Sequence, residues 1–211
     1  MNTEIGKMIL SIIKFINRFR FGLARRFHQY LTIAQCENAG IIFSPATTKF
    51  DGAPEIRFHK GCTVSIGPYF RCVSSRHIGM ENHVFSRISV HGGGNLCIGH
   101  HSGMTNSTIN CHQSITIGNY VNIGAGCLIV DSDFHSLDWR DRMDGTDIHK
   151  KRNAPVVIKD LAFIGAHSII LKGVTIGEKS IVGAGSVVAH NIPDGEIWAG
   201  NPARFIRKIK E

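Results

Sequence analysis

An apolar residue recurs at every sixth position over much of this chain. The clearest series lies near the C-terminus and consists of isoleucine and valine only: Ile158, Ile164, Ile170, Ile176, Val182 and Val188. Two shorter series precede it: Ile66, Cys72, Ile78, Val84 and Val90, then Cys111, Ile117, Ile123 and Ile129. Hydrophobic residues are 43% of the chain, so chance would fill a fixed row of six in only about 0.6% of cases. The period therefore reports a structural repeat.

A six-residue period fits neither an α-helix nor a hairpin, but it is typical of a parallel β-solenoid in which each hexapeptide forms one strand and one turn. The sequence thus predicts an all-β parallel β-helix whose aliphatic rows fill a narrow interior. Glycine often follows the apolar residue, as at Gly165 and Gly183. We expect these glycines to supply a turn conformation that a side chain would resist.

The period disappears between Ile129 and Ile158, and residues 131–155 form a polar and charged insertion. A long segment with no hydrophobic period is usually either disordered or functional. Phe134 and Trp139 favour a functional loop, because a solvated loop has little use for exposed aromatic residues.

Residues 1–30 predict a basic amphipathic helix. Apolar residues recur there at helical spacing: Ile5, Ile9, Ile12, Ile16, Phe19, Leu23 and Tyr30. The segment has six basic residues against Glu4 alone, and so holds most of the net charge of +8. The helix either packs on the protein or a partner subunit, or lies on an anionic membrane surface, and it is too short in apolar residues to span one. Residues 31–60 predict a lead-in β segment, and 61–211 the β-helix domain.

Composition excludes several classes of protein. A chain of 211 residues suits one main domain. Its six cysteines include no C-x-x-C pair, and no cysteine–histidine cluster has metal-ligand spacing. We therefore expect reduced core thiols, no metal site and a cytoplasmic protein without a signal peptide. Nucleic-acid binding is not expected, because no basic patch or recognition motif follows residue 30.

Three passages resemble a known family. They are the repeats, as in residues 164–169 and 182–187, the motif Asp131-Ser-Asp-Phe-His135, and the closing Ala199-Gly-Asn-Pro-Ala-Arg204-Phe-Ile-Arg207. In this order they are similar to the hexapeptide-repeat acyltransferases of left-handed parallel β-helix fold, above all the sugar and polysaccharide O-acetyltransferases. The resemblance covers about residues 60–207. It implies acetyl-CoA-dependent transfer to a sugar or glycan hydroxyl, in surface polysaccharide biosynthesis, by a homotrimer with sites between subunits.

The resemblance implies that His135 is the general base. Acetyl transfer to an alcohol requires a base, and histidine suits that task near neutral pH. His149 on the same insertion is the competing candidate. Three nearby carboxylates could orient the base, namely Asp131, Asp133 and Asp138, and a backbone carbonyl could serve instead. Asn106 matches an asparagine that some members place beside the catalytic histidine.

For the donor, the resemblance implies that backbone groups around Ala166 and Ala184 hold the pantetheine arm of acetyl-CoA. Arg204 and Arg207 would contact its phosphates. Trp198 either stacks on the adenine or caps the end of the solenoid. Two other functions stay open, an N-acetyltransferase acting on an amino sugar and a non-catalytic scaffold of the same fold. A zinc enzyme on this fold is not expected, because the required histidine spacing is missing.

Overall fold

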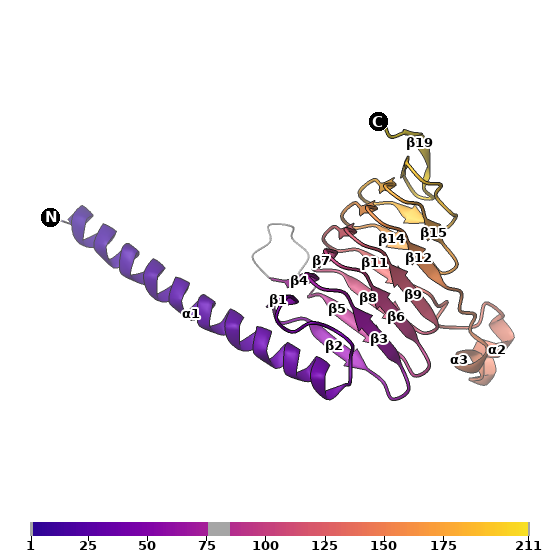
Figure 1. Cartoon of the computed structure of the whole chain (residues 1–211), viewed down its shortest axis with the longest axis horizontal. Coiled ribbons are helices and arrows are strands. Elements are labelled where there is room, and N and C mark those ends of the chain that lie inside the picture. The colour runs from indigo at the N-terminus through magenta and orange to yellow at the C-terminus, as the bar shows by residue number, and fades with distance from the viewer. Residues whose placement is uncertain (1, 76–84, 211) are drawn as a thin grey trace.

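The computed structural model describes residues 2–75 and 85–210, with the side chains of its first helix described at residues 7, 8 and 11 and from 22 onward. A helix leads into a triangular solenoid whose coils stack along one axis (Figure 1). Ile78 and Val84, two positions of the first apolar series, lie outside the described residues.

Three sheets form the walls of the solenoid, and their strands alternate along the chain. Sheet B contains β1 (Lys49–Gly52), β4 (Arg71–Ser74), β7 (Gly103–Thr105), β10 (Asn122–Ile123), β13 (Phe163–Ile164), β16 (Ile181–Val182), β18 (Glu196–Ala199) and β19 (Arg204–Lys208). Sheet C contains β2 (Glu55–Phe58), β5 (Arg87–Val90), β8 (Thr108–Cys111), β11 (Leu128–Val130), β14 (Ile169–Ile170) and β17 (Val187–Val188). Sheet A contains β3 (Thr63–Ile66), β6 (Asn95–Ile98), β9 (Ser114–Ile117), β12 (Val156–Ile158) and β15 (Thr175–Ile176).

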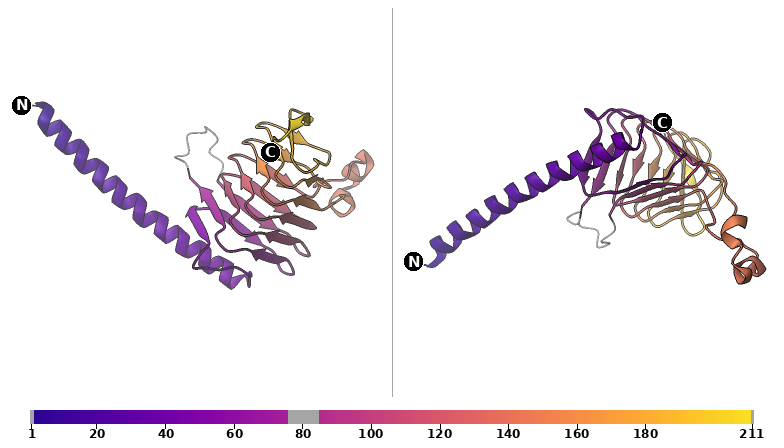
Figure 2. Two further views of the ribbon diagram at one scale, coloured as in Figure 1. Left: turned by 45° about the horizontal axis from the view of Figure 1, so that its top comes forward. Right: turned by 90° about the horizontal axis from the view of Figure 1, so that it is seen from below.

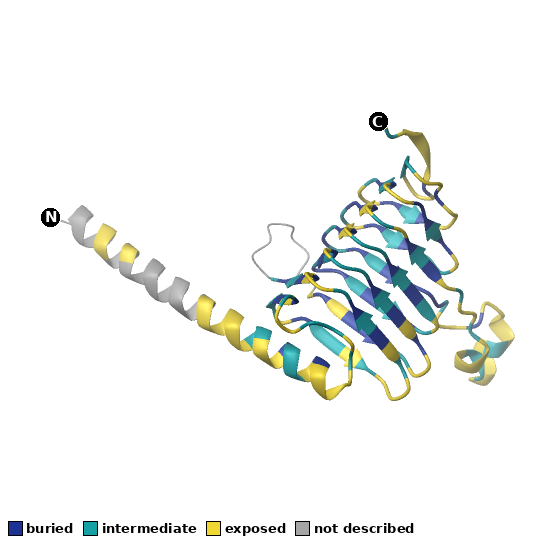
Figure 3. Ribbon diagram, in the orientation of Figure 1, coloured by how far each residue is buried: buried dark blue, intermediate teal, exposed yellow. Residues whose placement is uncertain are grey.

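The apolar rows seen in the sequence form the core. In sheet A five isoleucines pair in register on successive coils and are all buried: Ile66, Ile98, Ile117, Ile158 and Ile176. The described strands of each sheet pair in parallel, except that β19 runs antiparallel to β18. The predicted parallel β-helix is confirmed, and its buried strand positions are visible in Figure 3.

The glycines that follow the apolar residues are needed for a different reason from the one expected. At Gly165 an added Cβ would lie 2.5 Å from the backbone nitrogen of Ala184, on the next coil. The left-handed backbone occurs two residues later, at His167 and Gly185. These glycines therefore allow successive coils to approach closely, and the turn conformation belongs to other positions.

The helix α1 (Asn2–Asn38) extends eight residues beyond the predicted end at residue 30. Its last turns are held because Thr32 and Cys36, four residues apart, are both buried against the first coils. Gly40, in the left-handed conformation, ends it, and its N–H donates to the carbonyl of Glu37 at 2.9 Å.

The segment predicted to lead into the β structure, residues 31–60, contains the end of α1 followed by the strands β1 and β2. The strands β1 and β2 already lie in sheets B and C, so the solenoid begins at Lys49 instead of residue 61. Among the described helices, none has an apolar stretch long enough to cross a bilayer.

Candidate functional site

Residues 131–155 leave the solenoid at the corner between sheets C and A, which we call the CA corner. They connect β11 to β12 and include two short helices, α2 (Trp139–Asp144) and α3 (Asp147–Lys150). A neck of paired backbone joins this insertion to the solenoid. The N–H of Asp133 donates to the carbonyl of Arg152 at 3.0 Å, and that of Ala154 donates to the carbonyl of Asp131 at 2.9 Å. The helices project into solvent beyond this neck (Figure 2).

Asp131 anchors the neck from inside the protein. Its side chain is fully buried and accepts hydrogen bonds from the backbone N–H groups of His112, Gln113 and Ser114, each at 2.7 Å. These donors form the turn between β8 and β9 on the preceding coil. Asp131 is therefore committed to the solenoid and does not orient His135.

His135 is paired with a carboxylate that the sequence analysis did not consider. Its Nδ1 atom is hydrogen-bonded to Asp147, the first residue of α3, while 63% of the His135 side chain remains exposed. An ionised carboxylate can only accept, so Nδ1 carries the proton and the neutral ring keeps Nε2 as its basic nitrogen. The hydrogen bond from His135 lowers the pKa of Asp147, which stays ionised at neutral pH.

The two remaining sequence candidates have other partners. Asp133 forms an ion pair with Lys172 at 3.4 Å, and Asp138 caps α2 by accepting from the N–H of Arg140 at 2.9 Å. His149, the competing base, is exposed on α3. The one sequence signal for Asp147 is the preference for acidic residues in the first turn of a helix, and it does not reveal that this helix returns to His135.

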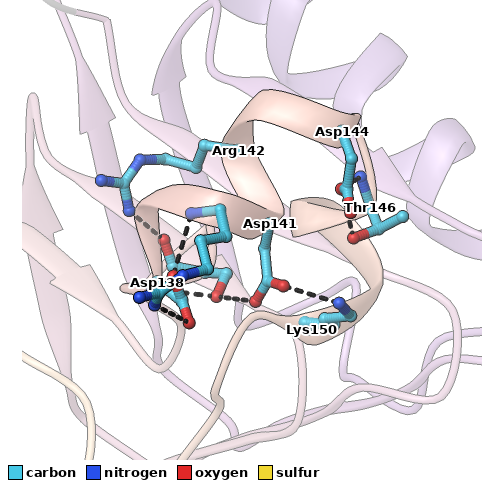
Figure 4. A network of polar contacts seen from close by, with 8 residues as sticks. Asp138, Asp141, Arg142, Asp144, Thr146 and Lys150 are labelled. Carbon is cyan, nitrogen blue, oxygen red and sulfur yellow. Dashed lines mark hydrogen bonds and ion pairs between the residues drawn. The ribbon is translucent and has the colours of Figure 1, made fainter.

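A polar network holds α3 against α2 (Figure 4). The Ser136 hydroxyl donates to Asp141 at 2.6 Å, and Lys150 donates to the other oxygen of the same carboxylate at 2.6 Å. Arg142 donates to the carbonyl of Ser136 at 2.5 Å. Since Ser136 follows His135 and Lys150 ends α3, this network fixes both sides of the His135–Asp147 pair.

Three histidine rings stack along the CA corner beside the neck. The ring centroids of His59 and His91 are 4.8 Å apart, and those of His91 and His112 are 3.7 Å apart. Lys151, directly after α3, lies with Nζ 3.0 Å from Nδ1 of His112. Burial, helped by His91 and Lys151, lowers the pKa of His112 to about 4. The ring is therefore neutral at physiological pH, and its Nδ1 atom accepts a hydrogen bond from the Lys151 ammonium group.

Asn106 lies at a different corner, between sheets B and C, which we call the BC corner. It is buried in a left-handed conformation, with φ at 42°. Its side-chain oxygen accepts from the N–H of Ser75 at 2.9 Å, and its side-chain nitrogen donates to the Ser75 carbonyl at 2.8 Å. Asn106 thus holds the backbone that leaves β4.

Ala166 and Ala184 occupy the same BC corner on successive coils. The N–H of Gly185 donates to the carbonyl of Ala166 at 2.8 Å, and Ala184 is exposed. Glycines 165 and 183 precede the two alanines, so little side-chain bulk covers the backbone along this edge. An extended chain such as pantetheine could lie against it.

Arg204 and Arg207 lie on β19, and both are exposed. Among the described residues, the guanidinium of Arg204 donates to the carbonyl of Ala203 at 3.1 Å, and that of Arg207 donates to the carbonyl of Lys208 at 3.2 Å. Trp198 pairs with Val182 in sheet B and packs against the core, and its indole N–H donates to Glu196 at 2.8 Å. This position favours the role of an end cap for Trp198.

One chain does not bring all the predicted site residues together. Asn106, Ala166 and Ala184 share the BC corner, whereas His135 lies on the insertion at the CA corner, and sheet C separates the two corners. In Figure 1, α2 and α3 stand out on the side of the solenoid away from β4 and β7. Within the part of the chain that the structure describes, no group of three or more histidine, cysteine, aspartate or glutamate side chains could hold a metal ion.

Comparison with known proteins supports the repeat assignment. Residues 155–190 match the family described as "Bacterial transferase hexapeptide (six repeats)". A 96-residue segment is 33% identical to 2,3,4,5-tetrahydropyridine-2,6-dicarboxylate N-acetyltransferase of Staphylococcus aureus (strain bovine RF122 / ET3-1), and covers 46% of this chain and 34% of that enzyme. The chain spans less than half the length of the first curated relatives that it matches.

Two solved structures share the fold over most of the chain. The hexapeptide-repeat containing acetyltransferase VCA0836 from Vibrio cholerae is 27% identical, with a TM-score of 0.55, and the match covers 97% of this chain and 94% of that one. A mutant of AntD, an N-acyltransferase from Bacillus cereus, in complex with dTDP-4-amino-4,6-dideoxyglucose and coenzyme A, is 21% identical, with a TM-score of 0.63 and coverage of 84% of this chain and 89% of that one. The second likeness concerns the fold alone.

Proposed function

We propose that this protein is an acetyltransferase that uses acetyl-CoA and acylates a sugar hydroxyl. The His135–Asp147 pair carries the proposal, because it supplies an exposed basic nitrogen on a segment that the β-helix itself does not need. The full-length likeness to a hexapeptide-repeat containing acetyltransferase supports the same class of reaction. A scaffold without catalysis would leave this pair without a purpose.

In the proposed reaction Nε2 of His135 takes the proton of the acceptor hydroxyl as its oxygen attacks the thioester carbonyl carbon. The carbon–sulfur bond then breaks, and the imidazolium returns the proton to the departing thiolate. Asp147 keeps Nδ1 protonated and stabilises the positive charge that His135 carries in between. We assign Asn106 the role of positioning the backbone at the BC corner, since its side-chain amide is hydrogen-bonded to the Ser75 backbone.

We also propose that the complete site forms between copies of a homotrimer. The donor candidates at the BC corner and the base at the CA corner are separated within one chain, and a neighbouring copy can bring the two corners together. Packing three narrow solenoids side by side also buries more surface than one can bury alone, and a threefold arrangement is closed. Arg204 and Arg207, exposed on β19, would meet the phosphates of acetyl-CoA.

The acceptor group is either a hydroxyl or an amino group of a sugar. We propose the hydroxyl of a glycan precursor of a surface polysaccharide. An amino sugar is the second candidate, because AntD, which has this fold, is an N-acyltransferase with an amino-sugar nucleotide bound. We place the reaction in the cytoplasm. Six free thiols, four of them buried, suit a reducing compartment.

The first experiment measures acceptor-dependent release of free thiol from acetyl-CoA over a panel of sugars, nucleotide sugars and amino sugars. Mass spectrometry then locates the acetyl group on oxygen or on nitrogen. The His135→Ala protein is the control for uncatalysed hydrolysis. Absence of acceptor-dependent release with every member of the panel would contradict the proposed reaction.

A second experiment tests the shared site by co-expressing two inactive variants. His135→Ala removes the base, and Ala184→Tyr places a large ring on the exposed BC corner. Each mixed threefold assembly should regain one native site in three, so random mixing of equal amounts should restore about a quarter of the activity. If the mixture stays inactive although mixed assemblies form, the base and the donor site belong to one chain.

A further inference from the structure

One face of the C-terminal part of α1, from residue 25 to residue 36, packs against the solenoid. Thr32 and Cys36 are buried there, and Gln29 donates from Nε2 to the carbonyl of Thr48 at 3.0 Å. Arg25, one turn earlier, donates to the carboxylate of Asp51 at 2.6 Å. The spacing of these residues, four, three and four, places them on one side of a helix with 3.6 residues per turn.

The opposite side of the helix is apolar and bare. Leu23, Phe27 and Tyr30 are 62%, 60% and 77% exposed. At about 100° per residue their positions lie roughly half a turn around the axis from Arg25 and Gln29. Together with Ala24 and Arg26 these three side chains line a shallow hollow. We call this surface the outer face of α1.

The sequence repeats the same apolar spacing toward the N-terminus. Ile5, Ile9, Ile12, Ile16 and Phe19 fall in register with Leu23, and Glu4 is the only acidic residue among the six basic ones of residues 1–30. Figure 1 shows this length of α1 standing away from the solenoid. An apolar stripe on a strongly basic helix is typical of helices that lie in the interface of an anionic bilayer.

We propose that α1 binds the surface of an anionic membrane through its outer face, lying in the plane of the interface. The charge decides against a second copy of the chain as the occupant, because a bundle of these helices would gather many cations with almost no acidic partners. Anionic headgroups supply the missing charge. Since the solenoid is attached to the opposite side of α1, it would stay on the water side.

This inference does not depend on the proposed reaction, but the two combine. A glycan acceptor assembled on a lipid carrier would be concentrated at the same surface, and the lipid-bound enzyme would meet it there. Binding would be reversible and weakened by salt, because part of it is electrostatic.

The test is co-sedimentation of the full-length chain with vesicles. One set contains phosphatidylglycerol mixed with phosphatidylcholine, and the other contains phosphatidylcholine alone. We expect binding to the anionic vesicles at low salt, at least tenfold weaker binding in 0.5 M salt, and weak binding to neutral vesicles throughout. Failure to bind the anionic vesicles at low salt overturns the proposal.

Two variants distinguish membrane binding through the apolar outer face from binding through charge alone. Leu23→Ser combined with Phe27→Ser should reduce binding to the anionic vesicles at least tenfold, because two large side chains no longer enter the interface. Ile42→Ser changes an apolar residue next to the solenoid that is at least as exposed, at 70%, and this control variant should bind as the parent does. Unchanged binding of the double variant overturns the proposal.

Light scattering without lipid distinguishes the competing occupant. We expect the double variant to keep the oligomeric state and the melting temperature of the parent, since both side chains are exposed in the single chain. Dissociation of the double variant into smaller species would assign the outer face to a contact between copies, and would reject the membrane surface as its occupant.

Discussion

The carboxylate of Asp147 accepts a hydrogen bond from Nδ1 of His135, although the two residues are twelve positions apart in sequence and the whole of α2 lies between them. The insertion therefore folds back on itself, so that His135, before α2, and Asp147, at the start of α3, lie side by side. Neither residue belongs to the solenoid walls. The relative position of the His135 and Asp147 side chains therefore depends on how α2 and α3 pack together and on the neck that joins them to the solenoid.

We expect His135→Ala to lower kcat by about 10²-fold or more, the usual scale for removing a general base. Assembly should be unchanged, because the side chain is largely exposed. Single-turnover rates with saturating acetyl-CoA provide the measurement. A comparable loss in His149→Ala, with His135→Ala near the parent, would move the base to His149.

Asp147→Asn should lower kcat by about tenfold or more while leaving both KM values close to the parent. Asparagine keeps an accepting oxygen but loses the charge that stabilises the imidazolium. Asp138→Asn is the matched control, since asparagine also caps a helix and Asp138 does not contact His135 in the structure. Equal losses in the two variants would mean that the insertion is merely sensitive to charge.

Replacing Arg204 and Arg207 with alanine should raise the KM for acetyl-CoA more than the KM for the acceptor. Both guanidinium groups are exposed, and neither forms an ion pair with an acidic residue in the described part of the chain. They can therefore bind a phosphate that is remote from the reaction. Lys179→Ala, an exposed cation at the corner between sheets A and B, is the control. A rise confined to the acceptor KM would instead place the acceptor at β19.

Two glycine variants should distinguish the two reasons for glycine in the repeats, which are the close approach of successive coils and the left-handed turn conformation. Gly165→Ala would force Cβ to within 2.5 Å of the Ala184 nitrogen, so the coils must separate, at a cost of about 3 kcal/mol or more. Gly185→Ala has free space around its Cβ but a φ of 71°, which costs about 1–2 kcal/mol. Chemical denaturation measures both, and the reverse order would contradict the close-approach explanation.

The stability of the protein should fall as the pH drops from about 6.5 to about 4. His112 has a folded-state pKa of about 4 against an ordinary value of 6.5, so over that interval the unfolded state takes up a proton that the folded state refuses. The stabilisation is complete above pH 6.5. His112→Phe keeps a flat ring against His91 and should flatten this dependence, whereas His149→Gln should not. Urea unfolding at pH 7.5 and pH 5 tests the difference.

Much of the fold follows from the sequence because a β-helix is locally periodic. A residue such as Ile164 meets its neighbour on the next coil, Val182, at a fixed distance along the chain, so a six-residue pattern is enough to identify the core. The position of His135 at the start of the non-periodic segment is visible for the same reason.

The remaining features depend on contacts that no period encodes. Asp147 meets His135 only because α2 and α3 pack through Ser136, Asp141 and Lys150. The extension of α1 beyond residue 30 is stabilised by the burial of Thr32 and Cys36 against the solenoid, a contact that the helical spacing of residues 1–30 does not encode. The close approach at Gly165 is equally a property of the neighbouring coil.

The burial of Cys36 and Thr32 has a consequence for the end of the solenoid. A stack of parallel strands that stops abruptly presents unpaired backbone and an open apolar bore, to which the end of another molecule could add. The final turns of α1 contact β1 and act as a plug at that end. Without the plug, end-to-end association into fibres would compete with closed assembly, so the same helix that reaches outward also protects this end of the solenoid from adding another molecule.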